Sequence, residues 1–463
     1  MKSCVLPMRW IIILLTSLGT FLLAGLAINI NIALVAMVNN TAVLKAGLDI
    51  NNTNDEVWRT LIMNEDGPFV WDDKMQGLIL GAYFYGAFIG QLPAGWIATF
   101  FSPKLQFATM IILSALANLL TPVSALSVPA LIFVRGFVGF LAGSNFPVVA
   151  EILSKWGPPK EKVAMSTVMY VGHAMAVIVF FPISGVIAKK VSWEALFYIE
   201  GVLTLIWIFP WMYYMYDTPM EHPRISASEK EFLKNEIGGN EAREIKVPLK
   251  KILTSGPVWA LIITHMCTAW GCYLLLEKIP QFMHTMLGLD IQANAVLNAI
   301  PYTCMLIFAF AFAHTFEYLV NIKLITLLNA RRTATFVSTV LPGICFIALG
   351  YVDYSTPTPA IALITTSATL IGAMYYAHIP NHEEIAPDLS GLLVAITSMF
   401  AIVSGMVLPN VVSAITDDNH TAEAWRTAFY ISFGVQLFGF LAYTMLGSVE
   451  PQPWGIFAKQ SST

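Results

Sequence analysis

Charge is the first thing that this sequence lacks. Only 12% of its 463 residues are Asp, Glu, Lys or Arg, whereas ordinary soluble domains carry roughly 25%. Two stretches, 11–38 and 105–134, contain no charged residue at all. Stretches of about 20 apolar residues are long enough to cross the hydrocarbon core of a bilayer as a helix. The scarcity of charge therefore excludes an ordinary soluble protein and indicates that the chain's surroundings are a lipid bilayer.

Features that would support catalysis, metal binding or nucleic-acid binding are also missing. The sequence has no nucleophile–base set, no metal-ligand spacing and no basic block suited to nucleic acid. Four of its five cysteines lie within apolar runs, which is typical of small buried residues rather than of a disulfide framework. We therefore predict no enzymatic activity, no resident cofactor, no metal and no nucleic-acid partner.

What the sequence does contain is a series of twelve apolar runs separated by polar breaks, which predicts an all-α membrane protein with about twelve spanning helices. The first six runs lie near 11–38, 76–101, 105–124, 127–152, 164–188 and 194–216. The second six lie near 257–277, 292–314, 334–352, 358–380, 389–415 and 425–447. The first run extends far beyond the roughly 7–15 apolar residues of a signal peptide, so we interpret it as a spanning helix.

An internal repeat relates the two sets of runs. Residues recur at offsets of 232 and 233, about half the chain length. The recurring pairs include Trp193 with Trp425, Phe197 with Phe429, Gly139 with Gly372, and Pro147 with Pro380. Because each half has an even number of helices, both halves point the same way across the membrane, as parallel repeats do. We predict an N-terminal half at 1–216, a cytoplasmic linker at 217–256 containing a short surface helix, and a C-terminal half at 257–463.

The distribution of Lys and Arg predicts the orientation of these helices. If the N-terminus is cytoplasmic, the cytoplasmic segments hold seventeen basic residues and the opposite side holds seven. The Asn-x-Thr sequons at Asn39, Asn51 and Asn419 all fall on that opposite side, where glycosylation takes place. We therefore predict that both termini are cytoplasmic and that these three asparagines are glycosylation sites.

Polar residues inside the runs are the candidates for substrate contact. Arg135 is the sole basic residue deep in a predicted helix, and its guanidinium suits carboxylate or phosphate groups. The alternative is a structural arginine that reaches the headgroups or pairs with a buried acid. The amides of Asn29, Asn31 and Asn145 either line a cavity or hydrogen-bond a neighbouring helix.

Other positions carry weaker signals of function. Glu200, His173 and His378 are candidates for proton coupling, although an ion pair or a packed histidine is the plainer interpretation. Trp270 and Tyr273, one turn apart, are either interface anchors or substrate contacts.

Several stretches resemble the anion:cation symporter family of the major facilitator superfamily, the group of sialin, the vesicular glutamate transporters and the sodium–phosphate cotransporters. They occur in family order across nearly the whole chain. The stretches are NIALVAMV at 31–38, QGLILGAYFYGAFIGQLPAGWIA at 76–98, VRGFVGFLAGSNFP at 134–147, SKWGPPKEK at 154–162, FPISGVI at 181–187, SWEALFYIEG at 192–201 and EIAPDLSGLLVAI at 384–396.

The resemblance implies a major facilitator fold, with substrate held between the halves and moved by alternating access. Arg135 matches the family's arginine on helix 4, and Tyr273 matches an aromatic position associated with substrate. Five positions depart from the family pattern. Ala27 replaces an arginine found in many members, Thr268 replaces one found in some, and Leu80 replaces the histidine of glutamate-transporting members. Ala142 replaces an acidic residue, and Ala98 stands where an acidic residue is common in the superfamily after helix 2. These departures argue against glutamate as the substrate.

Two functions follow from these observations. The leading hypothesis is a secondary active transporter of small anions, with phosphate or a monocarboxylate-type organic anion as substrate and a sodium, proton or voltage gradient as the driving force. The missing charges favour the alternative, a non-transporting receptor, sensor or assembly partner on the same fold. The tails contain no acidic dileucine signal, which favours the plasma membrane over an endolysosomal or vesicular membrane.

Overall fold

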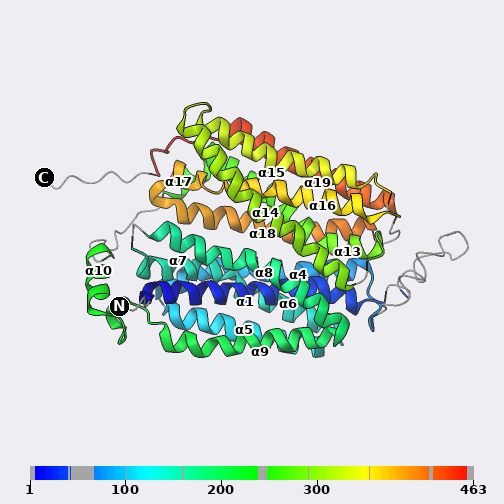
Figure 1. Cartoon of the computed structure of the whole chain (residues 1–463), viewed down its shortest axis with the longest axis horizontal. Coiled ribbons are helices and arrows are strands. Elements are labelled where there is room, and N and C mark those ends of the chain that lie inside the picture. Colours follow the sequence, from blue (N-terminus) through cyan, green and yellow to red (C-terminus); the bar gives the residue numbers. More distant parts are fainter. Residues whose placement is uncertain are drawn as a thin grey trace, which may run out of the picture. The chain divides into compact units, whose positions relative to one another are not determined.

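The computed structural model describes residues 6–39, 42, 67–100, 102–158, 161–237, 248–289, 291–353, 355–416 and 421–455. These residues are overwhelmingly helical, and the one β-bridge among them pairs Val38 with Phe69 (Figure 1). Ten of the described helices are long and apolar enough to cross a membrane, by their length and composition. The prediction of an all-α membrane protein is confirmed.

All twelve predicted segments are helical in the structure. The helices up to residue 237 are α1 (Met8–Met37), α4 (Asp73–Phe100), α5 (Pro103–Ser124), α6 (Val128–Gly143), α7 (Asn145–Trp156), α8 (Lys162–Lys190), α9 (Trp193–Tyr214), η1 (Pro219–Glu221) and α10 (Ala227–Ile237). Those that follow are α11 (Leu249–Leu253), α12 (Gly256–Tyr273), η2 (Leu274–Lys278), α13 (Ile279–Thr285), α14 (Ile291–Asn321), α15 (Leu327–Leu349), α16 (Pro357–Ile371), η3 (Gly372–Tyr375), α17 (Asn381–Ile385), η4 (Pro387–Leu389), α18 (Ser390–Thr416) and α19 (Ala422–Leu446).

Three predicted helices are interrupted rather than straight. The fourth breaks at Ser144 between α6 and α7. The seventh passes from α12 through the π-helical turn η2 into α13, which has Pro280 in its first turn. The tenth ends in η3 and a series of turns before α17. Proline lacks an N–H donor and cannot continue the regular hydrogen-bond ladder, and π-helical turns frequently occur at functional sites.

By internal contacts the chain forms two compact units, and two helices contribute to both. The first unit is Met1–Ile30 with Ala82–Lys246, and the second is Asn31–Gly81 with Val247–Thr463. The division therefore falls inside α1 and inside α4. The halves at 1–216 and 257–463 remain a prediction.

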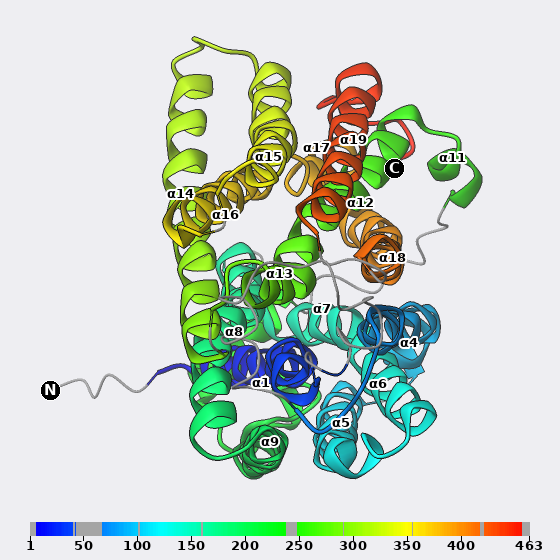
Figure 2. The same cartoon turned by 90° about the vertical axis from the view of Figure 1, so that its right-hand side faces the viewer.

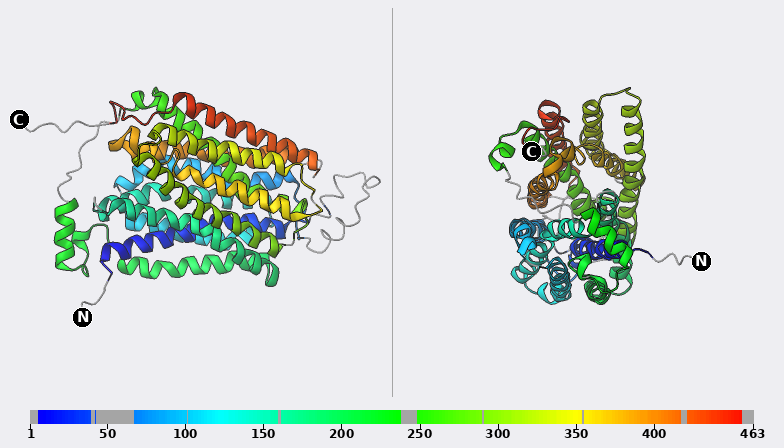
Figure 3. Two further views of the ribbon diagram at one scale, coloured as in Figure 1. Left: turned by 45° about the horizontal axis from the view of Figure 1, so that its top comes forward. Right: turned by 90° about the vertical axis from the view of Figure 1, so that its left-hand side faces the viewer.

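In the first unit, α5 packs against both α6 and α9, and α8 packs against α9 and α7 (Figure 2). Aromatic side chains fill the contact between α5 and α9, where the ring of Phe107 lies 4.9 Å from that of Trp211. The predicted surface helix of the linker is confirmed as α10, which lies beside the start of α1 (Figure 3).

In the second unit, α12 packs against α18 and α19, α15 packs against α16 and α19, and α14 packs against α16. One apolar cluster of this unit joins α12 to α18, with Leu261 and Leu393 at 0% exposure. A second cluster joins α14 to α15 around Phe312 and Ala334.

Candidate functional site

Close packing between α4 and α6 fixes the position of Arg135. A Cβ atom added at Gly139 of α6 would lie 1.9 Å from the carbonyl oxygen of Tyr83, and one added at Gly86 of α4 would lie 1.8 Å from that of Gly136. Glycines at these positions let the two backbones touch, as small residues do between membrane helices. Arg135 stands one turn before Gly139, so its orientation depends on this contact.

Arg135 is buried, with 2% of its surface exposed, and it reaches across to α1. Its Nη2 donates to the carbonyl oxygen of Ala27 over 2.8 Å, and its Nη1 donates to that of Leu26 over 3.4 Å. The guanidinium carbon also lies 5.5 Å from the centre of the Tyr83 ring, which is a cation–π contact. Backbone carbonyl oxygens of α1 and the ring of Tyr83 thus help to hold the guanidinium in place. Ala27 is also the position at which the family resemblance expects a second arginine.

A buried hydrogen-bonded cluster joins α1, α5, α8 and α9 in the same unit. The Nδ2 of Asn29 donates to Oε2 of Glu200 over 2.9 Å and to Oδ1 of Asn118 over 3.0 Å. The hydroxyl of Ser184 donates to Oε1 of Glu200 over 3.1 Å, and Nδ2 of Asn118 donates to the carbonyl oxygen of Phe197 over 2.8 Å. The structure thus brings Asn29 and Glu200 together and gives both an interhelical role.

Asn145 and His173 lie elsewhere in this unit. The Oδ1 of Asn145, in the first turn of α7, accepts a hydrogen bond of 3.5 Å from the hydroxyl of Thr20. His173 is exposed on α8, with its ring 6.3 Å from that of Phe146. Neither lies within the cluster around Glu200.

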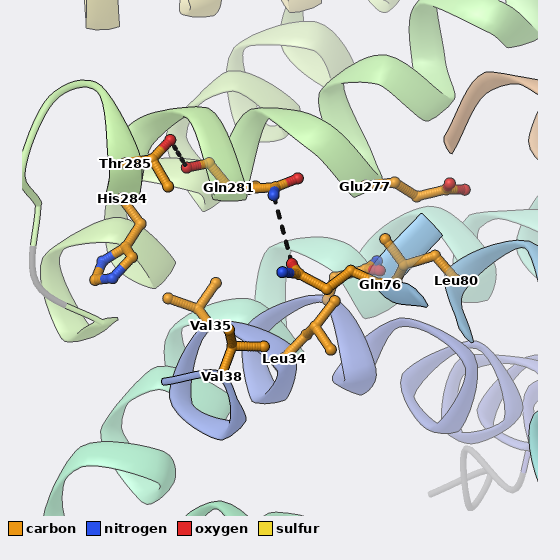
Figure 4. Close-up of a pocket in the computed structure, with 10 residues that line it drawn as sticks. Leu34, Val35, Val38, Gln76, Leu80, Glu277, Gln281, His284 and Thr285 are labelled. Carbon is orange, nitrogen blue, oxygen red and sulfur yellow. Dashed lines mark hydrogen bonds between the residues drawn. The ribbon is translucent and has the colours of Figure 1, made fainter. Parts of the chain in front are cut away.

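A small polar cavity occupies the second unit, between the end of α1, the start of α4, η2 and α13 (Figure 4). Its polar lining comes from Asn31, Gln76, Glu277, Gln281, His284 and Thr285. Its volume of about 20 Å³ is room for one water molecule and not for an organic anion. In this arrangement the cavity is closed to a substrate of that size.

The apolar side of the cavity carries one position of interest. Leu80, which stands where glutamate-transporting relatives are expected to have a histidine, lines the cavity together with the apolar residues of α1. Asn31 therefore shares a cavity with a position that the resemblance associates with substrate choice.

A network of buried charged and polar groups lies beside this cavity. Lys278 is fully buried, and its Nζ donates to the Ser413 hydroxyl over 2.7 Å and to Oε1 of Gln281 over 3.1 Å. The Nε2 of Gln281 in turn donates to Oδ1 of Asp73 over 3.0 Å, and the Thr416 hydroxyl donates to Oδ2 of Asp73 over 2.7 Å. The Gln281 amide thus links the cation to the carboxylate and ties α4 to α13 and α18.

The position of Lys278 differs from the sequence expectation. The predicted seventh helix ends at 277 and places this lysine in a loop, whereas the structure continues through η2 and α13 to Thr285. The charged residues Glu277 and Lys278 interrupt the apolar run, so the sequence pattern predicts that the helix ends there. The hydrogen bonds that Lys278 donates to Gln281 and Ser413 stabilise its buried ammonium group, and the sequence around Lys278 does not reveal them.

The remaining predicted residues take varied positions. The indole nitrogen of Trp270 donates to the Ser432 hydroxyl of α19 over 3.0 Å, a helix–helix contact, and Tyr273 ends α12 half-buried. His378 is fully buried near two other histidines. The side chain of Asn39 accepts a hydrogen bond from the backbone of Ala42. Asn51 and Asn419 lie outside the described residues.

Sequence reasoning missed several members of these sites. Asn118 and Ser184 carry no signal beyond being polar in apolar runs, and only their burial against Glu200 reveals a role. Gln76 and Gln281 lie near predicted helix ends, where polar residues are expected. The charged residues Asp73, Glu277 and Lys278 at the predicted helix ends are the sequence signals in this region.

Comparisons with known proteins place the chain among membrane carriers. The model of the Major Facilitator Superfamily matches residues 9–382. Sialin from Homo sapiens is 32% identical over 457 residues, which cover 97% of this chain and 91% of sialin. Vesicular glutamate transporter 2 from Bos taurus is 29% identical over 455 residues, covering 97% of this chain and 75% of that protein.

Solved structures show the same fold at low sequence identity. A bacterial homolog of the human lysosomal transporter Spinster, in an inward-facing and unoccupied conformation, matches with a TM-score of 0.64 at 12% identity and covers 96% of each chain. A D-xylose-proton symporter matches with a TM-score of 0.62 at 12% identity, covering 95% of this chain and 99% of its own.

Proposed function

The chain belongs to the Major Facilitator Superfamily, and we propose that it is a secondary active transporter of small organic or inorganic anions that works by alternating access. The observation that supports this proposal is the burial of the cationic side chain of Arg135 within the first unit. Its guanidinium is buried and donates hydrogen bonds to backbone carbonyl oxygens of α1 beside an aromatic ring. A carboxylate or phosphate that enters can take two parallel hydrogen bonds from such a group and neutralise it.

We propose phosphate or a monocarboxylate-type organic anion as the substrate. A single guanidinium balances one negative charge, and Ala27, Leu80 and Thr268 remove the further cationic or polar groups that the resemblance expects of glutamate transport. The relatives include proteins named for glutamate transport, so discrimination against glutamate is a specific expectation of this proposal. The driving force is a sodium, proton or voltage gradient.

We further propose that the protein resides in the plasma membrane with both termini cytoplasmic. The asymmetry of Lys and Arg supports the orientation. The alternative is a vesicular membrane, because some relatives are named as vesicular transporters. Surface biotinylation of intact cells measures the location. A glycosidase-sensitive mobility shift lost on Asn39→Gln, Asn51→Gln and Asn419→Gln together measures the orientation.

Uptake into proteoliposomes tests the transport proposal. A panel of labelled phosphate, monocarboxylates and glutamate is offered under imposed sodium, proton or voltage gradients. We expect gradient-driven uptake of phosphate or a monocarboxylate that falls at least about tenfold in Arg135→Lys, because an ammonium cannot reproduce bidentate binding. The matched control is Arg332→Lys, since Arg332 also donates to a backbone carbonyl, that of Thr444, and lies in the other unit.

Two outcomes contradict this proposal in different ways. Uptake that is unchanged in both Arg135→Lys and Arg135→Ala removes Arg135 from the substrate site but leaves transport intact. Binding of an anion without uptake under any gradient favours the second function, a receptor or sensor on the same fold. The absence of the charges expected at Ala27 and Ala142 is the observation behind that second function.

A further inference from the structure

Three histidines meet inside the second unit at a break in the tenth helix. His265 comes from the middle of α12, His378 from the turns that follow η3, and His382 from α17. The ring centres of His265 and His378 are 5.1 Å apart, and those of His265 and His382 are 6.4 Å apart. Non-helical backbone in a membrane carrier is typically found where it lines a binding site.

Two of the three imidazoles are tied to one hydroxyl. Thr397 of α18 contacts Nδ1 of His265 at 3.1 Å and Nε2 of His382 at 2.9 Å. The other ring nitrogen of His382 contacts the carbonyl oxygen of Ile379 at 2.9 Å, so this imidazole has partners on both sides. His265 and His382 are therefore held in fixed orientations around Thr397.

His378 differs from both of its neighbours. It is fully buried, and neither of its ring nitrogens has a hydrogen-bond partner among the residues that the structure describes. A buried polar group without a partner is destabilising, so an apolar residue would pack better than this histidine if packing were its only role. The ring pair with His265 places a half-exposed imidazole next to a fully buried one.

The carboxylates of α17 do not face the three histidines as free acceptors: Glu383 is exposed, and Glu384 is paired with other groups. Both oxygens of Glu384 are used, one by Arg331 of α15 and one by Asn381, and the hydroxyl of Tyr443 on α19 also donates to Asn381. Glu317 of α14 and Tyr376 lie on the Arg331 side of this group. The sequences of α16 and α18 contain no titratable residue, and α12 adds only Cys267, Cys272 and Tyr273.

These surroundings argue against a resident metal ion. No group of three or more His, Cys, Asp or Glu side chains in the described parts of the chain is placed to hold one. The small cation that an unpartnered imidazole nitrogen binds without further ligands is a proton.

We propose that His378, with His265 as its neighbour, is the binding site of a proton that accompanies the anion during transport, with Thr397 and His382 positioning His265. This inference rests on the proposed transport function. In the binding step, a ring nitrogen of His378 takes a proton from hydronium and leaves water, and the reverse step returns the proton to water. Burying an imidazolium without a counter-charge is costly, so the arrangement described here is the one that has released its proton. His265, being half-exposed, provides the path by which the proton leaves.

The first test does not depend on transport. The full-length protein, labelled with ¹⁵N-histidine and reconstituted in lipid nanodiscs, is titrated by NMR from about pH 8 down to about pH 4. We expect a titrating imidazole signal that is absent in His378→Phe and in His378→Gln but present in His314→Phe. His314 is the matched control because it is an exposed histidine of α14 outside the cluster. A set of titrating signals that is the same in wild type and in both His378 variants overturns the proposal.

The second test measures coupling. Anion uptake into proteoliposomes is measured under an imposed proton gradient and, separately, under an imposed voltage, while a trapped dye reports internal pH. We expect uptake by the wild type to carry protons and to rise several-fold under an about tenfold inward proton gradient. In His378→Phe we expect voltage-driven uptake to continue without proton movement and without that stimulation. Proton movement that is unchanged in His378→Phe overturns the proton site while transport stands. A His378-dependent titration in a protein that takes up no anion supports the proton site and defeats the transport proposal.

Discussion

The side-chain amide of Asn29 on α1 donates a 2.9 Å hydrogen bond to the carboxyl group of Glu200 on α9, and both side chains are buried. Asn118 and Ser184 complete the cluster from α5 and α8. Four helices of the first unit are thus joined by hydrogen-bonded side chains that are buried. In an apolar interior such a cluster defines which helix faces meet, because every other rotation of these helices leaves the same groups without partners.

The Glu200 cluster predicts a specific loss of stability. Glu200→Ala leaves donors of Asn29 and Ser184 without acceptors, at a cost of roughly 1–3 kcal/mol for each unsatisfied group. Glu200→Gln keeps a carbonyl acceptor and should retain most of the stability. The apparent melting temperature in detergent measures both variants, with Glu194→Ala of the same helix as control. A melting temperature of Glu200→Ala equal to that of the control contradicts the structural role of the cluster.

The contact between α4 and α6 predicts that a substitution at Gly139 impairs the function of Arg135 although Arg135 itself is unchanged. In Gly139→Val the added side chain meets the backbone carbonyl of Tyr83, which cannot move aside as a flexible side chain can, so the two helices must separate. We expect anion uptake to fall together with thermal stability. Gly434→Val of α19 is the control, because a Cβ atom there meets nothing within 4 Å. Full activity in Gly139→Val would show that Arg135 does not need this contact.

The sequence predicts the helices better than it predicts their interruptions. Long charge-free runs such as 11–38 place helices correctly because crossing a bilayer requires about 20 apolar residues, whatever their partners. The interruptions depend on groups distant in sequence. Lys278 can be buried in a π-helical turn because Ser413 accepts its hydrogen bond from 135 residues away. The predicted polar candidates Asn29 and Glu200 are correct as buried residues, but their pairing over 171 residues has no local signal.

The N-terminal end of α1 predicts a dependence of stability on pH. Arg9 donates to both oxygens of Glu161, at 2.9 Å and 3.0 Å, and to Oε1 of Glu229 on α10. The hydrogen bond from Arg9 holds the pKa of Glu161 below its ordinary value of 4.5. Because the folded pKa is the lower one, the stabilisation is complete above the unfolded pKa and is lost as pH falls through the folded pKa.

The difference in melting temperature between wild type and Glu161→Gln measures this dependence. We expect the wild type to be the more stable at about pH 7 and the difference to shrink steadily below about pH 4.5. Glu231→Gln, an exposed position on α10, serves as control and should match the wild type at every pH. A difference that stays constant down to about pH 3 would mean that the Arg9 contact does not act through the charge of Glu161.

The buried network beside the cavity predicts coupling between Asp73 and Lys278. Each group is charged and buried, and the Gln281 amide links them. Asp73→Asn or Lys278→Met alone leaves the other charge buried with weaker compensation, whereas the double variant removes both charges. A double-mutant cycle on the apparent free energy of unfolding should give a coupling of about 1 kcal/mol or more. Strictly additive effects would show that the two charges do not sense each other.

The contact between α4 and α18 in the second unit provides a direct test of movement. A Cβ atom added at Gly77 would lie 3.0 Å from the Cβ atom of Ser413, which is within the reach of a disulfide after a small adjustment. If this contact opens during each transport cycle, a disulfide there should block the cycle. We therefore expect uptake by the double variant Gly77→Cys, Ser413→Cys to fall at least about tenfold on oxidation and to recover with reductant.

The single variants, treated with the same oxidant, control for the native cysteines and for the hydrogen bond that Lys278 loses when Ser413 is changed. Uptake that survives quantitative cross-linking would mean that α4 and α18 stay together throughout the cycle. The moving contact would then lie elsewhere, and the network of Asp73 and Lys278 would be a fixed brace, since no part of the cycle would separate its members.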